Sequence, residues 1–315
     1  MRYLCYSFSF FACLWSTLAQ QASLPAFPKT SNGWELASTL NHAPLKEASG
    51  FAASIEHPGI LWTHNDGGAG SNIFAIDIAT GAIVATCKLP DIPNLDWEDA
   101  MTVTLESKHL VAIADIGDNE KRRHDCAIHL FQETPSSSAE PPSLRLYQSI
   151  RFRYPDGNRY DAESAAFDPL SGDFLVLTKS KTETLLFEIS RPAKAETVVE
   201  AKLITPLAKP TAYPKTDALV SLKRGIFGVS ATAADISPDG SLLAVLTYTE
   251  CLIYKRSSDE NNWHAAAQRA PLVIPLPGVY QAEALCFSTK GDELYVTSEN
   301  SPSPLYTIAV PLTQP

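Results

Sequence analysis

Residues 110–119 read Leu-Val-Ala-Ile-Ala-Asp-Ile-Gly-Asp-Asn, an apolar run that ends abruptly in acidic and amide side chains. The apolar part has the composition of a β-strand, and the polar residues follow where the strand would end. A second acidic stretch, Asp96-Trp-Glu-Asp99, leads into another short apolar run just upstream. The same order recurs along the chain, so we interpret residues 110–119 as part of a repeated unit.

The repeat has five alignable starts, each followed by a strand, a turn and a second strand. They are Glu47-Ala-Ser-Gly-Phe51, Asp99-Ala-Met-Thr-Val103, Glu163-Ser-Ala-Ala-Phe167, Thr232-Ala-Ala-Asp-Ile236 and Glu283-Ala-Leu-Cys-Phe287. Turns such as Ser237-Pro-Asp-Gly240 have Pro early and Gly late, which is typical of tight hairpins. Successive starts lie about 50 to 70 residues apart, the size of a four-stranded propeller blade with loop insertions.

These patterns predict an all-β protein, a single β-propeller with five blades. The last repeat has only three strands, and the spare strand, residues 34–40, lies near the N-terminus. Pairing the two would close the ring and remove two free sheet edges. Residues 205–228 and 132–160 are Pro-rich, and we interpret them as loop insertions on the propeller. Six blades are the alternative, if residues 205–228 contain a degenerate blade.

The N-terminal residues have the pattern of a secretory signal peptide. Arg2 precedes an apolar stretch, residues 3–18, and the small residue Ala19 follows. We expect a signal peptide at 1–19, a linker at 20–31 and the propeller at 32–315, in a secreted or periplasmic protein. A membrane anchor and a lipoprotein signal ending at Cys13 are the alternatives. No later segment has the length and apolar character of a membrane span, so stable membrane insertion is not expected.

The chain is acidic, with 35 Asp and Glu against 25 Lys and Arg. This balance argues against nucleic acid or an anionic membrane as a partner and favours cations or basic groups. Four cysteines, at 87, 126, 251 and 286, follow the signal peptide without any zinc-binding spacing. Buried free thiols and disulfides both fit this distribution.

The layout resembles secreted bacterial β-propellers of the phytase-like, regucalcin-like and TolB-like kinds. The closest likeness is to a group with the pattern D-W-E-D, D-I-G-D-N, Y-P-D-G and D-A-E. In this chain these motifs begin at Asp96, Asp115, Tyr154 and Asp161. The resemblance spans roughly residues 32–310 and implies the propeller fold, whereas it implies little about a reaction.

In a propeller, equivalent residues of all repeats meet at one end of the central channel, here called the mouth. We expect the acids that start the repeats and the polar tips to converge there. Oxygen ligands without Cys are typical of Ca²⁺ or Mg²⁺ sites. The candidate metal ligands are Glu47, Asp99, Asp115, Asp118, Asn119, Glu163 and Glu283. A structural role, capping backbone N–H groups or pairing with Lys179, Arg122 and Arg123, and a cation-free ligand pocket are the alternatives.

Further polar residues at the predicted tips are candidates for ligand binding. They are His64, Asn65, Asp66, Lys179 and Glu299. The chain has no G-x-S-x-G, H-E-x-x-H or phosphate-binding Gly-rich motif, and we assign no catalytic residue. We therefore expect a module that binds a small-molecule or protein ligand at the mouth. The alternative is a metal-dependent hydrolase of a phosphate ester or lactone, in which Lys179 or Arg123 would orient the substrate anion.

Overall fold

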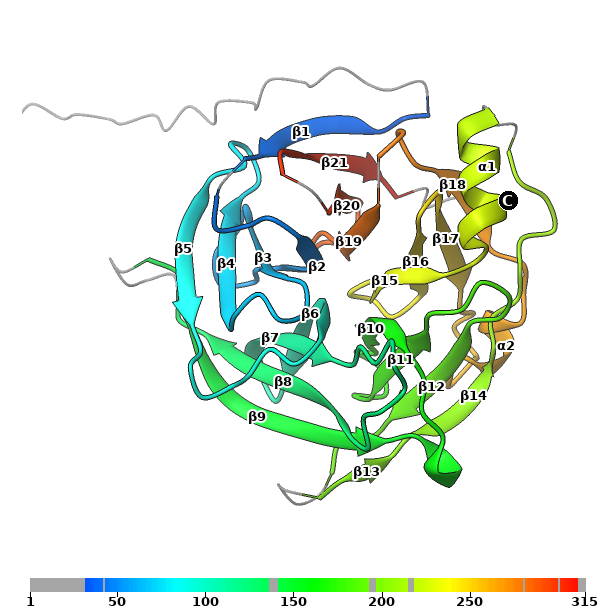
Figure 1. Cartoon of the computed structure of the whole chain (residues 1–315), viewed down its shortest axis with the longest axis horizontal. Coiled ribbons are helices and arrows are strands. Elements are labelled where there is room, and N and C mark those ends of the chain that lie inside the picture. Colours follow the sequence, from blue (N-terminus) through cyan, green and yellow to red (C-terminus); the bar gives the residue numbers. More distant parts are fainter. Residues whose placement is uncertain are drawn as a thin grey trace, which may run out of the picture.

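The computed structural model describes residues 32–310, apart from 42, 136–140, 193–196, 215–217, 280 and 300. Five small sheets are arranged in a ring around a central axis, as Figure 1 shows. The predicted five-bladed all-β propeller is therefore confirmed. The predicted signal peptide, 1–19, and linker, 20–31, lie outside the described residues. Within the described part, no helix is both long enough and apolar enough to cross a membrane.

Blades 1 to 5 are named in chain order, each from its inner strand at the axis to its outer strand. Blade 1 contains β2 (Ala48–Ala53), β3 (Ile60–Asn65), β4 (Asn72–Asp77) and β5 (Ile83–Lys88). Blade 2 contains β6 (Trp97–Leu105), β7 (Lys108–Asp115), β8 (Cys126–Glu133) and β9 (Leu144–Arg153), with β13 (Val199–Glu200) added in parallel to β9. Blade 3 contains β10 (Ala162–Phe167), β11 (Phe174–Thr178), β12 (Leu185–Ile189) and β14 (Lys202–Pro206).

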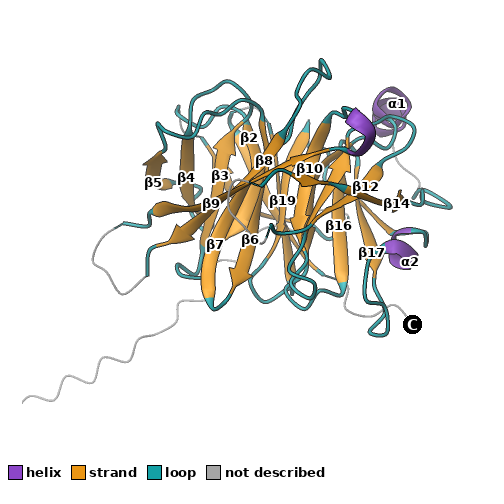
Figure 2. Cartoon of the chain, turned by 90° about the horizontal axis from the view of Figure 1, so that it is seen from below, coloured by secondary structure: helices purple, strands orange, loops and turns teal. Residues whose placement is uncertain are grey.

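The last two blades complete the ring. Blade 4 contains β15 (Ala231–Ile236), β16 (Leu242–Thr247), β17 (Glu250–Lys255) and β18 (Leu272–Pro275). Blade 5 contains β19 (Ala282–Phe287), β20 (Glu293–Ser298), β21 (Ser303–Ala309) and β1 (Glu35–Leu40). The helices are α1 (Ala218–Phe227), α2 (His264–Ala267) and a 3₁₀ turn at Pro155–Gly157. Figure 2 shows the strands from the side, with loops at both ends of the ring and α1 at the upper end.

The N-terminal strand closes the ring, as predicted. β1 pairs antiparallel with β21, so the first strand of the chain is the outer strand of the last blade. The buried Trp34 indole, next to β1, donates a hydrogen bond to the Pro275 carbonyl of blade 4 at 2.9 Å. The six-bladed alternative is wrong, because the described residues form five sheets, and those within 205–228 belong to the end of β14, to α1 and to connecting loops. Cys87, Cys126, Cys251 and Cys286 are buried free thiols.

The inner strands approach one another closely at the axis. All six residues of β2, β10 and β15 are buried, and Ala recurs in each of these strands. Gly50 has a φ of +65°, and a Cβ at this position would overlap the backbone of Asp99 and Ala100 on the next blade. Glycine is therefore required there both for its conformation and for its size.

One buried carboxylate links three blades at the axis. Asp99 on β6 has no exposed surface. Its Oδ2 accepts hydrogen bonds from the N–H groups of Ala165 on blade 3 and Ala234 on blade 4, each at 2.9 Å. Its Oδ1 accepts the N–H of Ala100, also at 2.9 Å. Asp235 makes a similar link between blades 4 and 5, accepting the N–H of Phe287. These contacts match the structural alternative for Asp99.

Replacing Asp99 tests this link. We expect Asp99→Ala to lower the free energy of unfolding by about 3 kcal/mol or more, because three buried N–H groups lose their acceptor. Urea denaturation of the wild type and the variant measures the difference. The control Asp91→Ala removes an exposed carboxylate and should change stability by no more than about 0.5 kcal/mol. Equal stabilities of the two variants would contradict the proposed role of Asp99.

Candidate functional site

Each of blades 2 to 5 has a β-bulge at the mouth end of its inner strand. The register of the inner strand shifts by one residue between Trp97 and Asp99, and equivalent shifts occur in the other three blades. The extra residues are Glu98, Glu163, Thr232 and Glu283. A bulge changes the direction of a side chain and is common next to functional sites. The repeated bulge therefore sets which residue of each blade faces the mouth.

Three carboxylates form the tightest acidic group of the described residues. Oxygens of Asp66, Asp96 and Glu98 all lie within 4.8 Å of one another, close enough to ligate one cation. Asp66 follows β3, and Asp96 precedes β6, which begins at Trp97. The group therefore joins the second strand of blade 1 to the inner strand of blade 2.

Glu98 is the buried member of this group. Its residue surface is only 5% exposed, and among the described residues no hydrogen bond or ion pair engages its carboxylate. Burial, then the charges of Asp66 and Asp96, raise the pKa of Glu98 well above its ordinary value. Burial and the charge of Asp66 likewise raise the pKa of Asp96 to about 6. The ionised forms of Asp96 and Glu98 are therefore disfavoured in the absence of a cation.

Two glycines make room for these carboxylates. A Cβ on Gly117 would overlap both Glu98 Oε1 and Asp96 Oδ2, and a Cβ on Gly67 would overlap Asp96 Oδ1. Gly117 is the glycine of the D-I-G-D-N stretch that marked the repeat. Its function in the structure is thus steric, since it lets the backbone pass directly over the acidic group.

A second pair of acids lies at the mouth beside blade 5. Burial, followed by the charge of Glu299, raises the pKa of Glu283 to about 8, and the Tyr248 hydroxyl donates a hydrogen bond to Glu283 at 3.3 Å. Burial and then the charge of Asp66 raise the pKa of Glu299. Lys179 is ion-paired with Glu163. Its positive charge offsets part of the rise in the pKa values of Glu98, Glu283 and Glu299, which remain raised. The structure therefore brings these acids together on one face.

Other predicted metal ligands have local partners. Asp115 accepts a hydrogen bond from Arg123 at 2.7 Å, and the two carboxylate oxygens of Asp118 accept the N–H groups of Arg122 and Arg123 at 2.7 and 2.9 Å. Burial tends to raise the pKa of Asp115, but His129 and Arg123 outweigh this effect and lower it. Asn119 is exposed. These contacts match the structural alternative for Asp115 and Asp118.

The remaining predicted residues lie at the edge of the mouth or below it. Glu47 is exposed at the rim and contributes to the raised pKa of Glu299. His64 is fully buried, with Nδ1 3.0 Å from the Asn65 carbonyl, and burial lowers its pKa. The Asn65 side chain accepts the N–H groups of Lys46 and Glu47 and donates to the Pro44 carbonyl. His64 is thus a neutral side chain of the interior, and Asn65 fixes the loop before β2.

The candidate metal ligands predicted from the sequence did not include Asp96, and Glu98 was considered only as the alternative to Asp99 among the acids that start the repeats. Both belong to the D-W-E-D motif, and Glu98 is the residue before the predicted ligand Asp99. Alignment of Glu98, rather than Asp99, with Glu163 and Glu283 is the signal that identifies it. Asp66 was among the predicted ligand-binding residues, and the structure places it directly beside them.

Comparison of the chain with protein-family models and with curated proteins finds no significant match. The propeller fold therefore rests on the structure itself. The more specific resemblance to phytase-like, regucalcin-like and TolB-like propellers stays a prediction.

The raised pKa values predict a falling stability as pH rises in the absence of divalent cations. An ordinary carboxyl in the unfolded chain has a pKa of about 4, whereas those of Asp96 and Glu283 are about 6 and about 8. The folded protein thus binds protons more tightly, and this contribution to stability is lost as pH rises from about 4 through 8. Urea denaturation in EDTA between pH 5 and 8 measures the decline.

Glu283→Gln should make this decline smaller, because it removes one of the two groups. The control Glu106→Gln, at an exposed turn, should show the same decline of stability with pH as the wild type. The same pH dependence in Glu283→Gln and in the wild type would contradict the raised pKa of Glu283.

Proposed function

We propose that the protein is a secreted or periplasmic binding module that holds a divalent cation, Ca²⁺ or Mg²⁺, between Asp66, Asp96 and Glu98. With the cation bound, the mouth would bind a small-molecule or protein ligand. The observation that carries the proposal is the convergence of three carboxylates within 4.8 Å around Glu98, whose residue surface is only 5% exposed and whose carboxylate has no hydrogen bond or ion pair from the described residues.

Electrostatics supports a cation at this position. An ionised carboxylate that leaves water without a partner costs several kcal/mol, and two neighbouring acids increase the cost. A divalent cation would offset this cost and accept oxygens from all three side chains. Ca²⁺ takes six to eight oxygen ligands in flexible geometry, and Mg²⁺ takes six in an octahedron. Three carboxylates plus water or a ligand oxygen suit either ion.

The hydrolase alternative has less support. It requires Lys179 or Arg123 to orient the anion of a phosphate ester or lactone. Lys179 is ion-paired with Glu163, and Arg123 donates to the Asp115 carboxylate and the Gly117 carbonyl. Both cations are thus occupied within the protein. A phosphatase and lactonase substrate panel on the cation-loaded protein tests the alternative directly.

Glu98→Gln separates a cation site from a merely acidic surface. In EDTA we expect the variant to melt at the same temperature as the wild type or higher, because a buried uncompensated acid is removed. In saturating Ca²⁺ we expect only the wild type to gain, by on the order of 5 °C at a hundredfold excess over Kd. Thermal melting in EDTA, Ca²⁺ and Mg²⁺ measures both effects. Equal gains in the two proteins, or no gain in the wild type, would contradict the site.

A matched pair of glycine variants controls for general damage. Gly117→Ala should weaken the Ca²⁺ response, because its Cβ would displace Glu98 and Asp96. Gly225→Ala in α1 adds the same methyl group where no atom lies within 4 Å of the new Cβ, so it should preserve the full response.

A further inference from the structure

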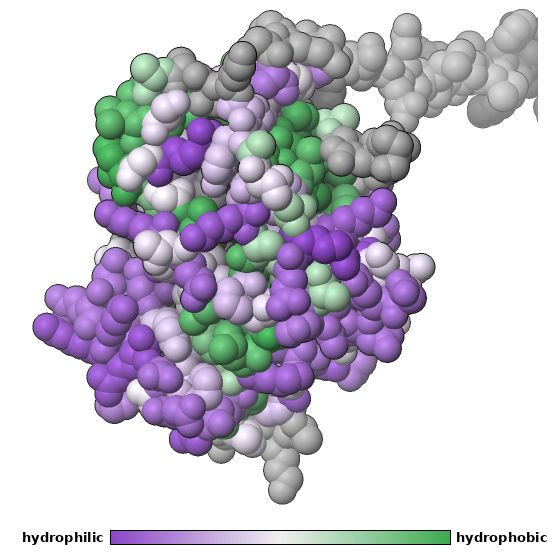
Figure 3. Space-filling model, turned by 90° about the vertical axis from the view of Figure 1, so that its right-hand side faces the viewer, coloured by the Kyte–Doolittle hydropathy of each residue, from purple (hydrophilic) through white to green (hydrophobic). Residues whose placement is uncertain are grey.

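Helix α1 presents three of its apolar residues to solvent. Leu219, Leu222 and Ile226 are 61%, 60% and 49% exposed, and no residue of the helix is buried. Their spacing of three and four residues places them on one face of the helix. In Figure 3 a hydrophobic patch lies at the upper left of the molecule, where α1 projects. We call these three residues the α1 stripe.

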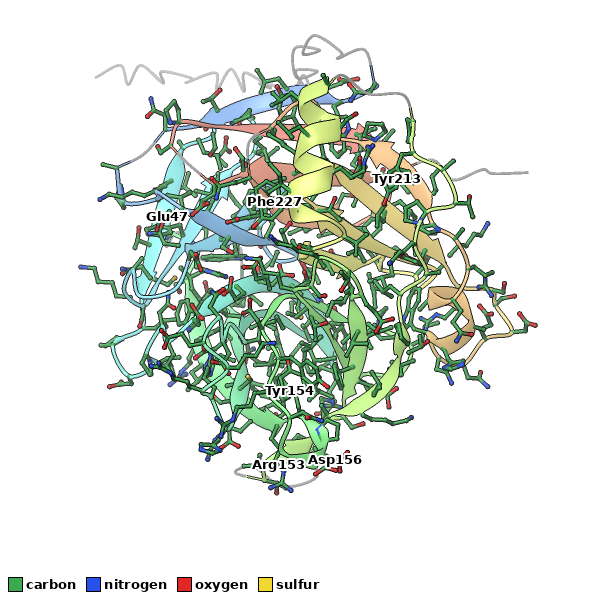
Figure 4. All side chains as sticks on the ribbon, turned by 45° about the vertical axis from the view of Figure 1, so that its right-hand side comes forward. Glu47, Arg153, Tyr154, Asp156, Tyr213 and Phe227 are labelled. Atoms are coloured by element: carbon green, nitrogen blue, oxygen red, sulfur yellow. The ribbon has the colours of Figure 1, made fainter. Side chains whose placement is uncertain are left out.

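The two basic residues of the same helix contact the propeller. Arg224 donates to Glu250 at 2.9 Å, and its guanidinium lies 4.0 Å from the ring centre of Tyr213. Lys223 donates to the Val279 carbonyl at 3.4 Å. Figure 4 shows Tyr213 beside the helix and Phe227 at its end. A surface helix normally buries its apolar face and exposes its charges, whereas α1 exposes three large apolar side chains and its two basic side chains contact the propeller.

The end of α1 adjoins the acidic mouth. The ring of Phe227, its last residue, lies 4.5 Å from the ring of Tyr248. The Tyr248 hydroxyl in turn donates to Glu283, whose neighbour at the mouth is Glu299. Since a helix rises 1.5 Å per residue, the α1 stripe begins beside this end, at Ile226, and extends about 10 Å along the helix to Leu219. An apolar surface and an acidic surface therefore lie side by side.

We propose that the α1 stripe and the pair Glu283 and Glu299 together form a docking surface for a protein segment that carries apolar side chains next to Lys or Arg. The apolar side chains would cover Leu219, Leu222 and Ile226, and the basic group would pair with the two acids. The inference rests on the proposed function, because it names the partner class for the same mouth.

Charge favours this occupant over two others. A second copy of the chain, seated stripe to stripe, would bring two acidic mouths together in a molecule of net charge −10. An anionic membrane would meet the same repulsion, and the basic residues Lys223 and Arg224 contact the propeller rather than a bilayer. A basic and apolar protein segment complements both surfaces.

Two synthetic peptides test the proposal by fluorescence anisotropy with the Ca²⁺-loaded full chain. One is an amphipathic Leu/Lys helix, and the other has Glu in place of every Lys. We expect the Leu/Lys peptide to bind the wild type, and to bind both Leu222→Gln/Ile226→Gln and Glu299→Gln at least tenfold more weakly. The control Leu170→Gln changes a 67% exposed leucine outside the stripe and should bind as the wild type does.

Several results would overturn the docking surface. The first is that Leu222→Gln/Ile226→Gln binds the Leu/Lys peptide as tightly as the wild type does, and the second is that the wild type binds the Leu/Glu and Leu/Lys peptides equally. The third is dimerisation of the chain through the α1 stripe, measured by sedimentation. The fourth is binding of the chain to anionic vesicles through Leu222. Thermal melting of the same samples in Ca²⁺ and EDTA keeps the two proposals apart. Ca²⁺ stabilisation without peptide binding would contradict only the docking surface. Stripe-dependent peptide binding without Ca²⁺ stabilisation would contradict only the cation site.

Discussion

The buried carboxylate of Asp99 holds the centre of the propeller together. It accepts backbone hydrogen bonds within blade 2 and from blades 3 and 4. Gly50 on blade 1 lies against the backbone of the same residue, so that no side chain fits between them. Asp99 thus connects blade 2 both to its neighbour, blade 3, and across the axis to blade 4, and such links at the axis determine how closely the inner strands approach. The position of every side chain at the mouth depends on this spacing.

The mouth combines two opposing requirements. The bulges place Glu98, Glu163 and Glu283 at equivalent positions at the mouth, while burial and the charges of nearby acids raise the pKa values of Glu98 and Glu283. Lys179 compensates Glu163 through a direct ion pair. Glu98 has no comparable partner among the described residues, and a bound cation is the simplest way to compensate it. The acids beside blade 5 are then available for a basic group of a partner.

The propeller was predictable from the sequence because its turns and strand compositions are local signals that repeat along the chain. The site was harder, because adjacent residues of a strand point to opposite sides. A bulge at Glu98 sends this residue to the mouth and leaves Asp99 at the axis, and only the choice of alignment with Glu163 and Glu283 distinguishes the two in the sequence. Asp115 and Asp118 look like metal ligands, yet Arg123 and nearby N–H groups engage them. Residues 205–228 were expected to be a loop because they are Pro-rich, whereas α1 forms within them.

Anomalous diffraction from crystals soaked in Mn²⁺ tests the central claim most directly, because Mn²⁺ shares the carboxylate preference of Ca²⁺ and Mg²⁺. The account predicts an anomalous peak between Asp66, Asp96 and Glu98, about 2.0–2.6 Å from an oxygen of each. A crystal with the mouth open to solvent and no anomalous peak at these three carboxylates would contradict it.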